Sequence, residues 1–264
     1  MRALGVAVAG VSLPLLLGVV LLGGVLAPQD PTASVAAAWQ PAGPGHPLGT
    51  DGLGRDVWSR VLAGGRDLLV TGVAAALAAS LVGVAGGLAA GWAGRTWDRV
   101  LTGVADLLLA VPTLLLALLA AVTLPGRAAV VVATVCGGAP LTLRVVRDAV
   151  RSLRHSGYVE AALCRGERPV AVVVREVLPV MRGLVAADLG LRLVVALQIA
   201  SALNLLGFGV SPPAPDWALM LRENMPGIAA NPAAVAAPAV ALGLVTVALA
   251  LAVQTVTHHR GSDG

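Results

Sequence analysis

The chain has 264 residues, of which 57% are apolar and only 12% are charged, and its mean hydropathy is +0.87. Soluble domains contain about 45–50% apolar residues, so a single globular core could not hide this much apolar surface. The composition therefore indicates an integral membrane protein. A pI of 10.4 could also suggest nucleic-acid binding, but membrane proteins retain Arg on the cytoplasmic side of their spans, and we expect no nucleic-acid partner.

Several kinds of chemical site are excluded or disfavoured. All 18 basic residues are Arg, and a P-loop needs a Lys to reach the nucleotide phosphates, so this chain cannot carry that ATP site. Cys136 and Cys164 have no CxxC or zinc spacing, and the four His are scattered apart from His258 and His259. No HExxH or GxSxG motif occurs. We therefore expect no metal site, no cofactor and no catalytic residues in this chain.

Six apolar runs are long enough to cross a bilayer, which takes about 17–25 helical residues. They are Leu4–Ala27, Leu68–Ala93, Val100–Leu124, Ala128–Val146, Leu184–Phe208 and Ala233–Val256. The first run exceeds the roughly 7–15 residues of a signal-peptide core, so we expect it to be retained rather than cleaved. The predicted organisation is a first transmembrane helix (1–27), an external loop (28–67), a core of five transmembrane helices (68–256) with a cytoplasmic loop at 147–179, and a tail (257–264).

The distribution of Arg predicts the orientation. With the N-terminus in the cytoplasm, 12 Arg lie on the cytoplasmic side and five outside, while Arg192 lies within a span. Because cytoplasmic loops carry the excess of positive charge, both termini are expected in the cytoplasm.

The stretch GYVEAALCRGERPVAVVVREVLP, residues 157–179, lies in the predicted cytoplasmic loop. It reads as two short helices, with Gly166 in the left-handed conformation after the first and Pro169 in the first turn of the second. Its apolar side chains are expected to be exposed: Val159, Ala162, Leu163, Val170, Val173 and Val174. Such a hairpin could lie in a groove of another protein or pack on the helix ends of its own subunit, and these residues alone leave both open.

The spacing of certain residues within this stretch resembles that of a known sequence motif. Glu160-Ala161-Ala162, three residues, Gly166, eleven residues and Leu178-Pro179 resemble the EAA motif of binding-protein-dependent ABC importer permeases. In that family the motif forms coupling helices that dock into the ATPase subunit. The resemblance implies this role for Tyr158, Glu160, Ala161, Ala162, Gly166, Leu178 and Pro179.

Two further stretches resemble the dipeptide, oligopeptide and nickel branch of the same family. HPLGTDGLGRDVWSRVLAGGR (46–66) is similar to a signature before the second span, and LLGFGVSPPAPDW (205–217) is similar to a segment after the fifth. The residues of the first signature are Gly49, Thr50, Asp51, Gly54, Arg55 and Asp56. No strand precedes its glycines, so a phosphate loop is disfavoured and a tight turn braced by Asp51, Arg55 and Asp56 is expected. The sequence departs from the branch at Ala200, where relatives carry an acidic residue, and at Asn204-Leu205.

Polar residues inside the spans are candidates for lining a solute path, because they are costly in a membrane. Asp106, Asp188, Arg192 and Asn204 are of this kind. Alternatively, Asp188 and Arg192 can neutralise each other at i and i+4, Asp106 can bond across a helix interface, and Asn204 can join helices. Small residues in the second predicted span favour close helix packing; they are Gly83, Gly86, Gly87 and Gly91.

The resemblance implies an all-α membrane protein with six transmembrane helices and the type I ABC importer permease architecture. The expected partners are a homologous permease in a heterodimer, two cytoplasmic P-loop ATPases that bind ATP and Mg, an external solute-binding protein and the lipid of a bacterial cytoplasmic membrane. The implied solute is a di- or oligopeptide, with nickel or another small solute as the alternative. An ion-driven secondary transporter is a rival, but we find no matching halves in the sequence. An intramembrane hydrolase is disfavoured because the spans contain no His.

Overall fold

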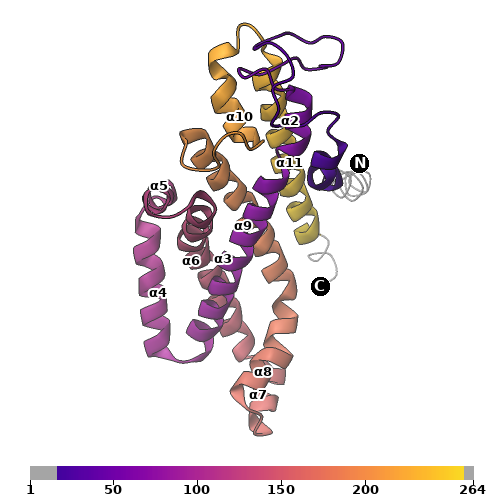
Figure 1. The fold of residues 1–264 in the computed structure, drawn as a ribbon. Coiled ribbons are helices and arrows are strands. Elements are labelled where there is room, and N and C mark those ends of the chain that lie inside the picture. The colour runs from indigo at the N-terminus through magenta and orange to yellow at the C-terminus, as the bar shows by residue number, and fades with distance from the viewer. Residues whose placement is uncertain (1–16, 259–264) are drawn as a thin grey trace.

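The structure is a computed structural model that describes residues 17–258, and within that range it is helical with no strands. The described part begins with a short apolar helix, Leu17–Leu26, and the other elements follow a long loop. They are α2 (Val57–Ala63), α3 (Arg66–Trp92), α4 (Arg95–Ala110), α5 (Thr113–Thr123), α6 (Gly126–Arg154), α7 (Gly157–Cys164), α8 (Pro169–Val172), η1 (Val173–Val177), α9 (Leu178–Leu206), α10 (Trp217–Asn224), η2 (Met225–Gly227) and α11 (Ala233–His258). Figure 1 shows the long helices side by side, with the loop and α10 at one end and α7 and α8 at the other. The predicted all-α class is confirmed.

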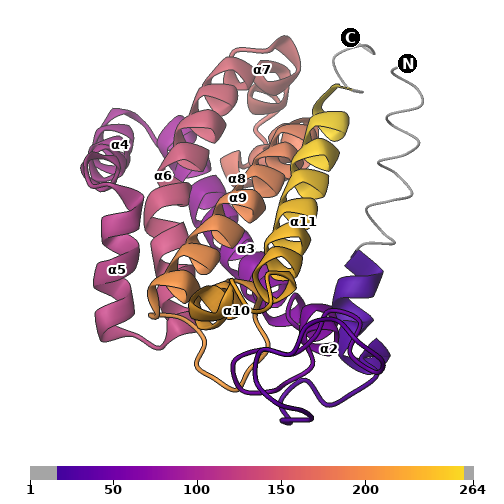
Figure 2. The ribbon, with the colours of Figure 1, turned by 90° about the horizontal axis from the view of Figure 1, so that it is seen from above.

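Helices α3, α6 and α9 form the centre of the bundle, with α4 and α5 on one side and α11 on the other (Figure 2). The predicted glycines hold α3 against α6. A Cβ added to Gly87 would lie 2.6 Å from the Val146 Cβ, and one added to Gly83 would lie 2.4 Å from the Thr142 Cβ. Gly86 and Gly91 face α6 in the same way. The backbones can approach this closely only because these positions lack side chains.

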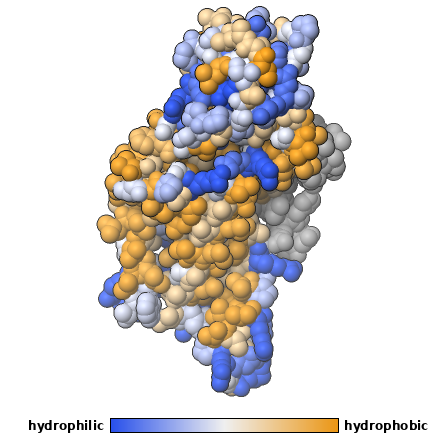
Figure 3. Space-filling view, viewed as in Figure 1, coloured by the Kyte–Doolittle hydropathy of each residue, from blue (hydrophilic) through white to orange (hydrophobic). Residues whose placement is uncertain are grey.

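The outer surface of the bundle is apolar, as a lipid environment requires. On the face shown in Figure 3, hydrophobic residues cover most of the middle of the molecule, and hydrophilic residues gather toward both ends. Large side chains such as Leu81, Leu107 and Val122 are at least 70% exposed. At 1.5 Å per residue, the 27 residues of α3 measure about 40 Å, which is enough to cross a hydrocarbon core of about 30 Å.

The predicted third span, Val100–Leu124, is not a single straight helix. Helices α4 and α5 meet at an angle of 86°, with a break at Val111 and Pro112. Pro112 has no N–H to donate, and its ring disfavours helical backbone at the residue before it. Val111 is accordingly extended, with φ −95° and ψ 128°. The sequence analysis treated this run as one continuous helix and was wrong in that respect.

The remaining spans agree with the sequence to different degrees. The predicted spans at 68–93, 128–146, 184–208 and 233–256 coincide with α3, α6, α9 and α11, and four helical stretches of the described chain are long and apolar enough to cross a membrane. The broken pair α4 and α5 could provide a fifth span. Most of the predicted first span, Leu4–Ala27, lies outside the described residues, and only Leu17–Leu26 of it is seen as a helix.

Candidate functional site

The hairpin of residues 157–179, which the sequence predicts on the cytoplasmic side, lies at the end of the molecule opposite the long loop (Figure 1). Its first helix, α7, ends in a Schellman motif: the N–H of Glu167 bonds to the carbonyl of Ala162 at 3.3 Å, and the N–H of Gly166 bonds to that of Leu163 at 2.9 Å. Gly166 has a φ of +79°. The predicted left-handed glycine is confirmed, and it reverses the chain between the two helices.

The inner face of the hairpin packs on its own subunit. Val159 and Ala162 are fully buried, although the sequence analysis expected both to be exposed. Together with Val172 and Val177 they contact Val146 and Val150 of α6 and Met181 of α9. We name these seven residues the hinge core. The expectation failed because Val159 and Ala162 are three residues apart and therefore share one face of α7, which turns toward α6.

The outer face of the hairpin is open to a partner. Tyr158 is 43% exposed, Val170 is 74% exposed and Val174 is 55% exposed. Glu160 and Ala161 are also exposed, and within residues 17–258 Glu160 forms no ion pair. The motif residues are thus divided between the two faces, with Ala162 inside and Tyr158, Glu160 and Ala161 outside. Gly166 and Pro179 are exposed and Leu178 is partly buried.

The second half of the hairpin runs into α9 without a break. Pro169 stands in the first turn of α8, as predicted, and a five-residue π-helix, Val173–Val177, joins α8 to α9. Pro179 lies in the first turn of α9 and does not end a separate helix. Helical turns therefore extend over 38 residues, from Pro169 to Leu206, or about 57 Å at 1.5 Å per residue. Because these turns are continuous, a tilt of α8 would also move α9.

The GTDGLGRD signature at the other end forms the predicted tight turn. Gly49 and Gly54 have positive φ values of 71° and 73°. The Asp51 carboxylate accepts the N–H groups of Leu53 and Arg55, each at 2.9 Å. Asp56 caps α2 by accepting the Ser59 N–H at 2.8 Å. The buried Thr50 hydroxyl donates to the Ala37 carbonyl at 2.7 Å. The signature residues are thus bound within their own subunit.

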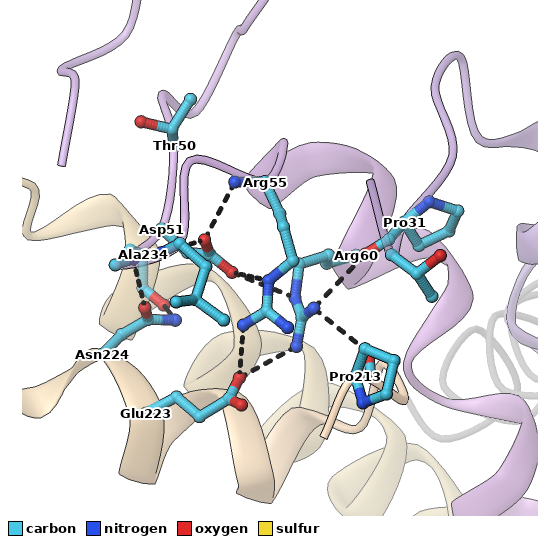
Figure 4. Close-up of polar contacts among 12 residues, drawn as sticks. Pro31, Thr50, Asp51, Arg55, Arg60, Pro213, Glu223, Asn224 and Ala234 are labelled. Carbon is cyan, nitrogen blue, oxygen red and sulfur yellow. Dashed lines mark hydrogen bonds and ion pairs between the residues drawn. The ribbon is translucent and has the colours of Figure 1, made fainter. Parts of the chain in front are cut away.

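A buried group of four charged residues connects this turn to α10 (Figure 4). Arg55 donates to Asp51 at 2.6 Å and to Glu223 at 2.8 Å. Arg60 donates to Glu223 at 3.0 Å and lies 3.4 Å from Asp51. We name Asp51, Arg55, Arg60 and Glu223 the external ion cluster. Two cations facing two anions leave no net charge, which is the condition for burying such groups at tolerable cost.

The sequence analysis missed half of this cluster. Arg60 was counted only toward the charge asymmetry, and Glu223 was not considered. Asn231 was missed as well, and its side-chain amide donates to the carbonyls of Leu48 and Thr50 at 3.0 Å each. Glu223 and Asn231 lie more than 160 positions from the residues that they bind, so no local pattern indicated them. Over residues 46–66 the three Arg exceed the two Asp by one positive charge, which would have pointed only to an acidic partner elsewhere in the chain.

The charged path-lining candidates of the spans form ion pairs inside the subunit. Asp188 and Arg192 form the expected i,i+4 ion pair at 3.3 Å, and the Thr142 hydroxyl donates to Asp188 at 2.5 Å. Both charged side chains are less than 10% exposed. Asp106 of α4 forms an ion pair with Arg144 of α6. A path-lining role for these residues stays a prediction.

Asn204, the last path-lining candidate, lies at the external end of α9. Its Oδ1 accepts the Val210 N–H at 2.9 Å, which holds the turn that follows α9. Within residues 17–258, no group of three or more His, Cys, Asp or Glu side chains is arranged to hold a metal ion. Two other features stand out in the described chain. A hairpin packs on α6 and α9 at one end, and a loop is fixed by ion pairs at the other.

Comparison with known proteins gives a consistent result. The family described as "Binding-protein-dependent transport system inner membrane component" matches residues 83–259. The glutathione transport system permease protein GsiD of Pectobacterium atrosepticum is 33% identical over 207 residues, covering 78% of this chain and 69% of that protein. The oligopeptide transport system permease protein OppC of Bacillus subtilis is 32% identical over 202 residues, covering 76% and 66%. GsiD of Escherichia coli is 31% identical over 207 residues, covering 78% and 68%.

Proposed function

Because the chain belongs to the family of binding-protein-dependent transport system inner membrane components, we propose that it is the permease subunit of an ATP-driven importer of short peptides. It encloses the solute path with a homologous permease. Two cytoplasmic ATPases hydrolyse ATP, with Mg, and an external binding protein delivers the solute. This subunit performs no covalent chemistry.

The observation that carries the proposal is the two-sided hairpin. Its outer face presents Tyr158, Glu160 and Val170 to a partner, while its inner face is fixed to α6 and α9 through the hinge core. Packed interiors transmit displacement because they resist compression. Closure of the ATPases would therefore move the hairpin and, with it, the cytoplasmic ends of two central helices.

The names of the relatives support the choice of solute. The matched proteins are permeases for glutathione and for oligopeptides, and glutathione is itself a small peptide-like molecule. These names favour a peptide over nickel.

The orientation that we propose places both termini and the hairpin in the cytoplasm. It rests on the excess of Arg on that side. In this orientation the external ion cluster lies outside, beneath the surface that a binding protein would approach.

Reconstitution tests the proposed function directly. The chain is co-expressed with a homologous permease and the ATPases, and the complex is placed in vesicles with the binding protein. We expect uptake of labelled di- and tripeptides only with internal ATP. Peptide uptake driven by an ion gradient, in vesicles that contain this chain and no ATPase, would contradict the proposal and support a secondary transporter.

A further inference from the structure

Asp216, in the turn before α10, is a buried carboxylate that is only half satisfied. Its side chain is 0% exposed. One oxygen, Oδ1, accepts the N–H of Leu219 at 3.0 Å and so caps α10. The other oxygen, Oδ2, is buried and has no hydrogen-bond partner among the described residues. A buried carboxylate oxygen without a partner is costly, so its surroundings need an explanation.

Asp216 lines a small pocket at the external end of the bundle. The pocket lies between the first turns of α3 and α6, the end of α9 and the turn before α10. Its polar lining consists of Asp67, Thr71, Arg127, Asn204 and Asp216. Four of these five side chains carry oxygen atoms that can accept a hydrogen bond or coordinate a cation.

The charges around the pocket do not balance. Arg127 binds Asp67 through two contacts, at 2.5 and 3.2 Å, so these two residues neutralise each other. Asp216 is left with one negative charge and no ion-pair partner within residues 17–258. Burial raises the pKa of the Asp216 carboxyl, and this effect outweighs the opposing influence of the Leu219 and Ala218 N–H groups and of the Asn204 side chain; the nearby Asp67 adds a smaller rise. An ionised Asp216 therefore needs one positive charge that the described chain does not supply.

We propose that this pocket binds one small monovalent cation, either an alkali metal ion or an ammonium ion, with the Asp216 Oδ2 as its charged ligand. Thr71 and Asn204 belong to the same lining and carry side-chain oxygen atoms that would complete its surroundings. The bound cation neutralises the buried carboxylate and stabilises the Asp216 cap of α10. It also ties α10 to α3, α6 and α9, and so stabilises the external end of the subunit. The inference is independent of the proposed transport function, because it concerns a site that the cytoplasmic hairpin does not contact.

Hydrogen exchange of α10 provides a local test. The full chain in lipid nanodiscs is labelled at about pH 8 in the chloride salt of sodium, potassium, ammonium or N-methyl-D-glucamine at equal ionic strength, and peptides from residues 217–224 are followed by mass spectrometry. At a concentration about ten times Kd, a small cation should slow exchange there about tenfold relative to the bulky organic cation. The effect should become smaller when the pH is lowered from about 8 to about 5, because the raised pKa of Asp216 favours its protonated form as the solution becomes more acidic.

Two variants make the test specific. Asp216→Asn keeps a capping oxygen but removes the charge, and it should abolish the cation effect. Asp30→Asn removes an exposed carboxylate that binds only Thr32 in the long loop, and it should leave the effect unchanged. Equal exchange in all four salts at about pH 8 would overturn the proposal. A cation effect of the same size in Asp216→Asn, or one that is unchanged at about pH 5 in the wild type, would also overturn it.

Discussion

Arg55 and Glu223 are 168 residues apart in the sequence, and their side chains form a 2.8 Å ion pair that joins the external loop to α10. Arg60 binds the same Glu223 oxygen at 3.0 Å. Removing that single carboxylate would leave two buried guanidinium groups facing only Asp51. The long loop is thus held in place by Glu223, a residue that lies outside the loop.

Substitution Glu223→Gln is therefore expected to destabilise the protein by about 3 kcal/mol, the usual loss when one partner of a buried ion pair is removed. Glu167→Gln is the control, since it breaks an ion pair with the 61% exposed Arg165 and should cost less than about 1 kcal/mol. Unfolding of the purified chain in detergent, followed by Trp fluorescence, compares the two. Equal losses would show that the external ion cluster does not stabilise the fold.

The packing of α3 on α6 predicts a difference between two glycines. Ala at Gly87 would bring a Cβ within 2.6 Å of the Val146 Cβ and 2.8 Å of the Leu143 carbonyl, whereas Gly103 of α4 has open space around it. We expect Gly87→Ala to destabilise the chain by about 1–3 kcal/mol through overpacking. Gly103→Ala should be neutral or stabilise by up to about 1 kcal/mol, because Ala favours helix. The same unfolding measurement distinguishes them, and a neutral Gly87→Ala would contradict the close approach of these helices.

Asp216 predicts a pH dependence of stability. Burial raises the pKa of its carboxyl above the ordinary value of 3.8, so the folded state holds the proton more tightly than the unfolded state. The resulting stabilisation is complete below pH 3.8 and is lost as the pH rises through the folded-state pKa. With N-methyl-D-glucamine as the only added cation, the wild type should lose stability relative to Asp216→Asn between about pH 4 and 8. A constant difference across that range would argue against the buried, unpaired carboxyl.

The sequence predicted this fold well where the signal is local. Continuous apolar runs predicted α3, α6, α9 and α11, and Gly166 with Pro169 predicted the bend of the hairpin. The break at Pro112 was not predicted, because a continuous apolar run indicates the length of a span but not whether its helix bends. The burial of Val159 and Ala162 was missed because the face of a short helix is decided by what lies beside it, here α6.

The same contrast between local sequence signals and long-range packing applies to the end of the molecule that carries the long loop. The turn around Gly49 and Gly54 could be predicted, since positive φ and a bracing Asp are local requirements. The roles of Glu223 and Asn231 could not, because they depend on packing across more than 160 residues. The sequence around Asp216 indicated only a Pro-rich turn. Its unpaired oxygen is evident only in the structure, where α3, α6 and α9 meet the turn before α10.

The orientation of the chain gives a prediction about the membrane. A reporter fused after Gly65 should behave as external and one fused after Gly166 as cytoplasmic. The helices that precede these positions, α2 and α7, lie at opposite ends of the bundle (Figure 1), and the Arg excess surrounds the second position. Alkaline phosphatase and a fluorescent protein, which work on opposite sides of the membrane, provide the readout. The reverse pattern would place the hairpin outside and remove any contact with cytoplasmic ATPases.

The central claim is that the cytoplasmic hairpin docks the ATPases through its outer face. Glu160→Lys reverses an exposed charge there. Gly166→Val strains a backbone with a φ of +79° by about 1–2 kcal/mol, although no atom lies within 4 Å of the added Cβ. Gly157→Ala in the same hairpin also meets nothing within 4 Å and requires no positive φ, so it serves as the matched control.

The most direct measurement is the amount of ATPase subunit that co-purifies with each permease variant, together with solute-stimulated ATP hydrolysis in reconstituted vesicles. We predict that Glu160→Lys and Gly166→Val insert normally but lose most of the bound ATPase and of the stimulated hydrolysis, while Gly157→Ala retains both. Unchanged ATPase retention and unchanged stimulation in Glu160→Lys and Gly166→Val would contradict the docking claim and leave the hairpin as a packing element of its own subunit.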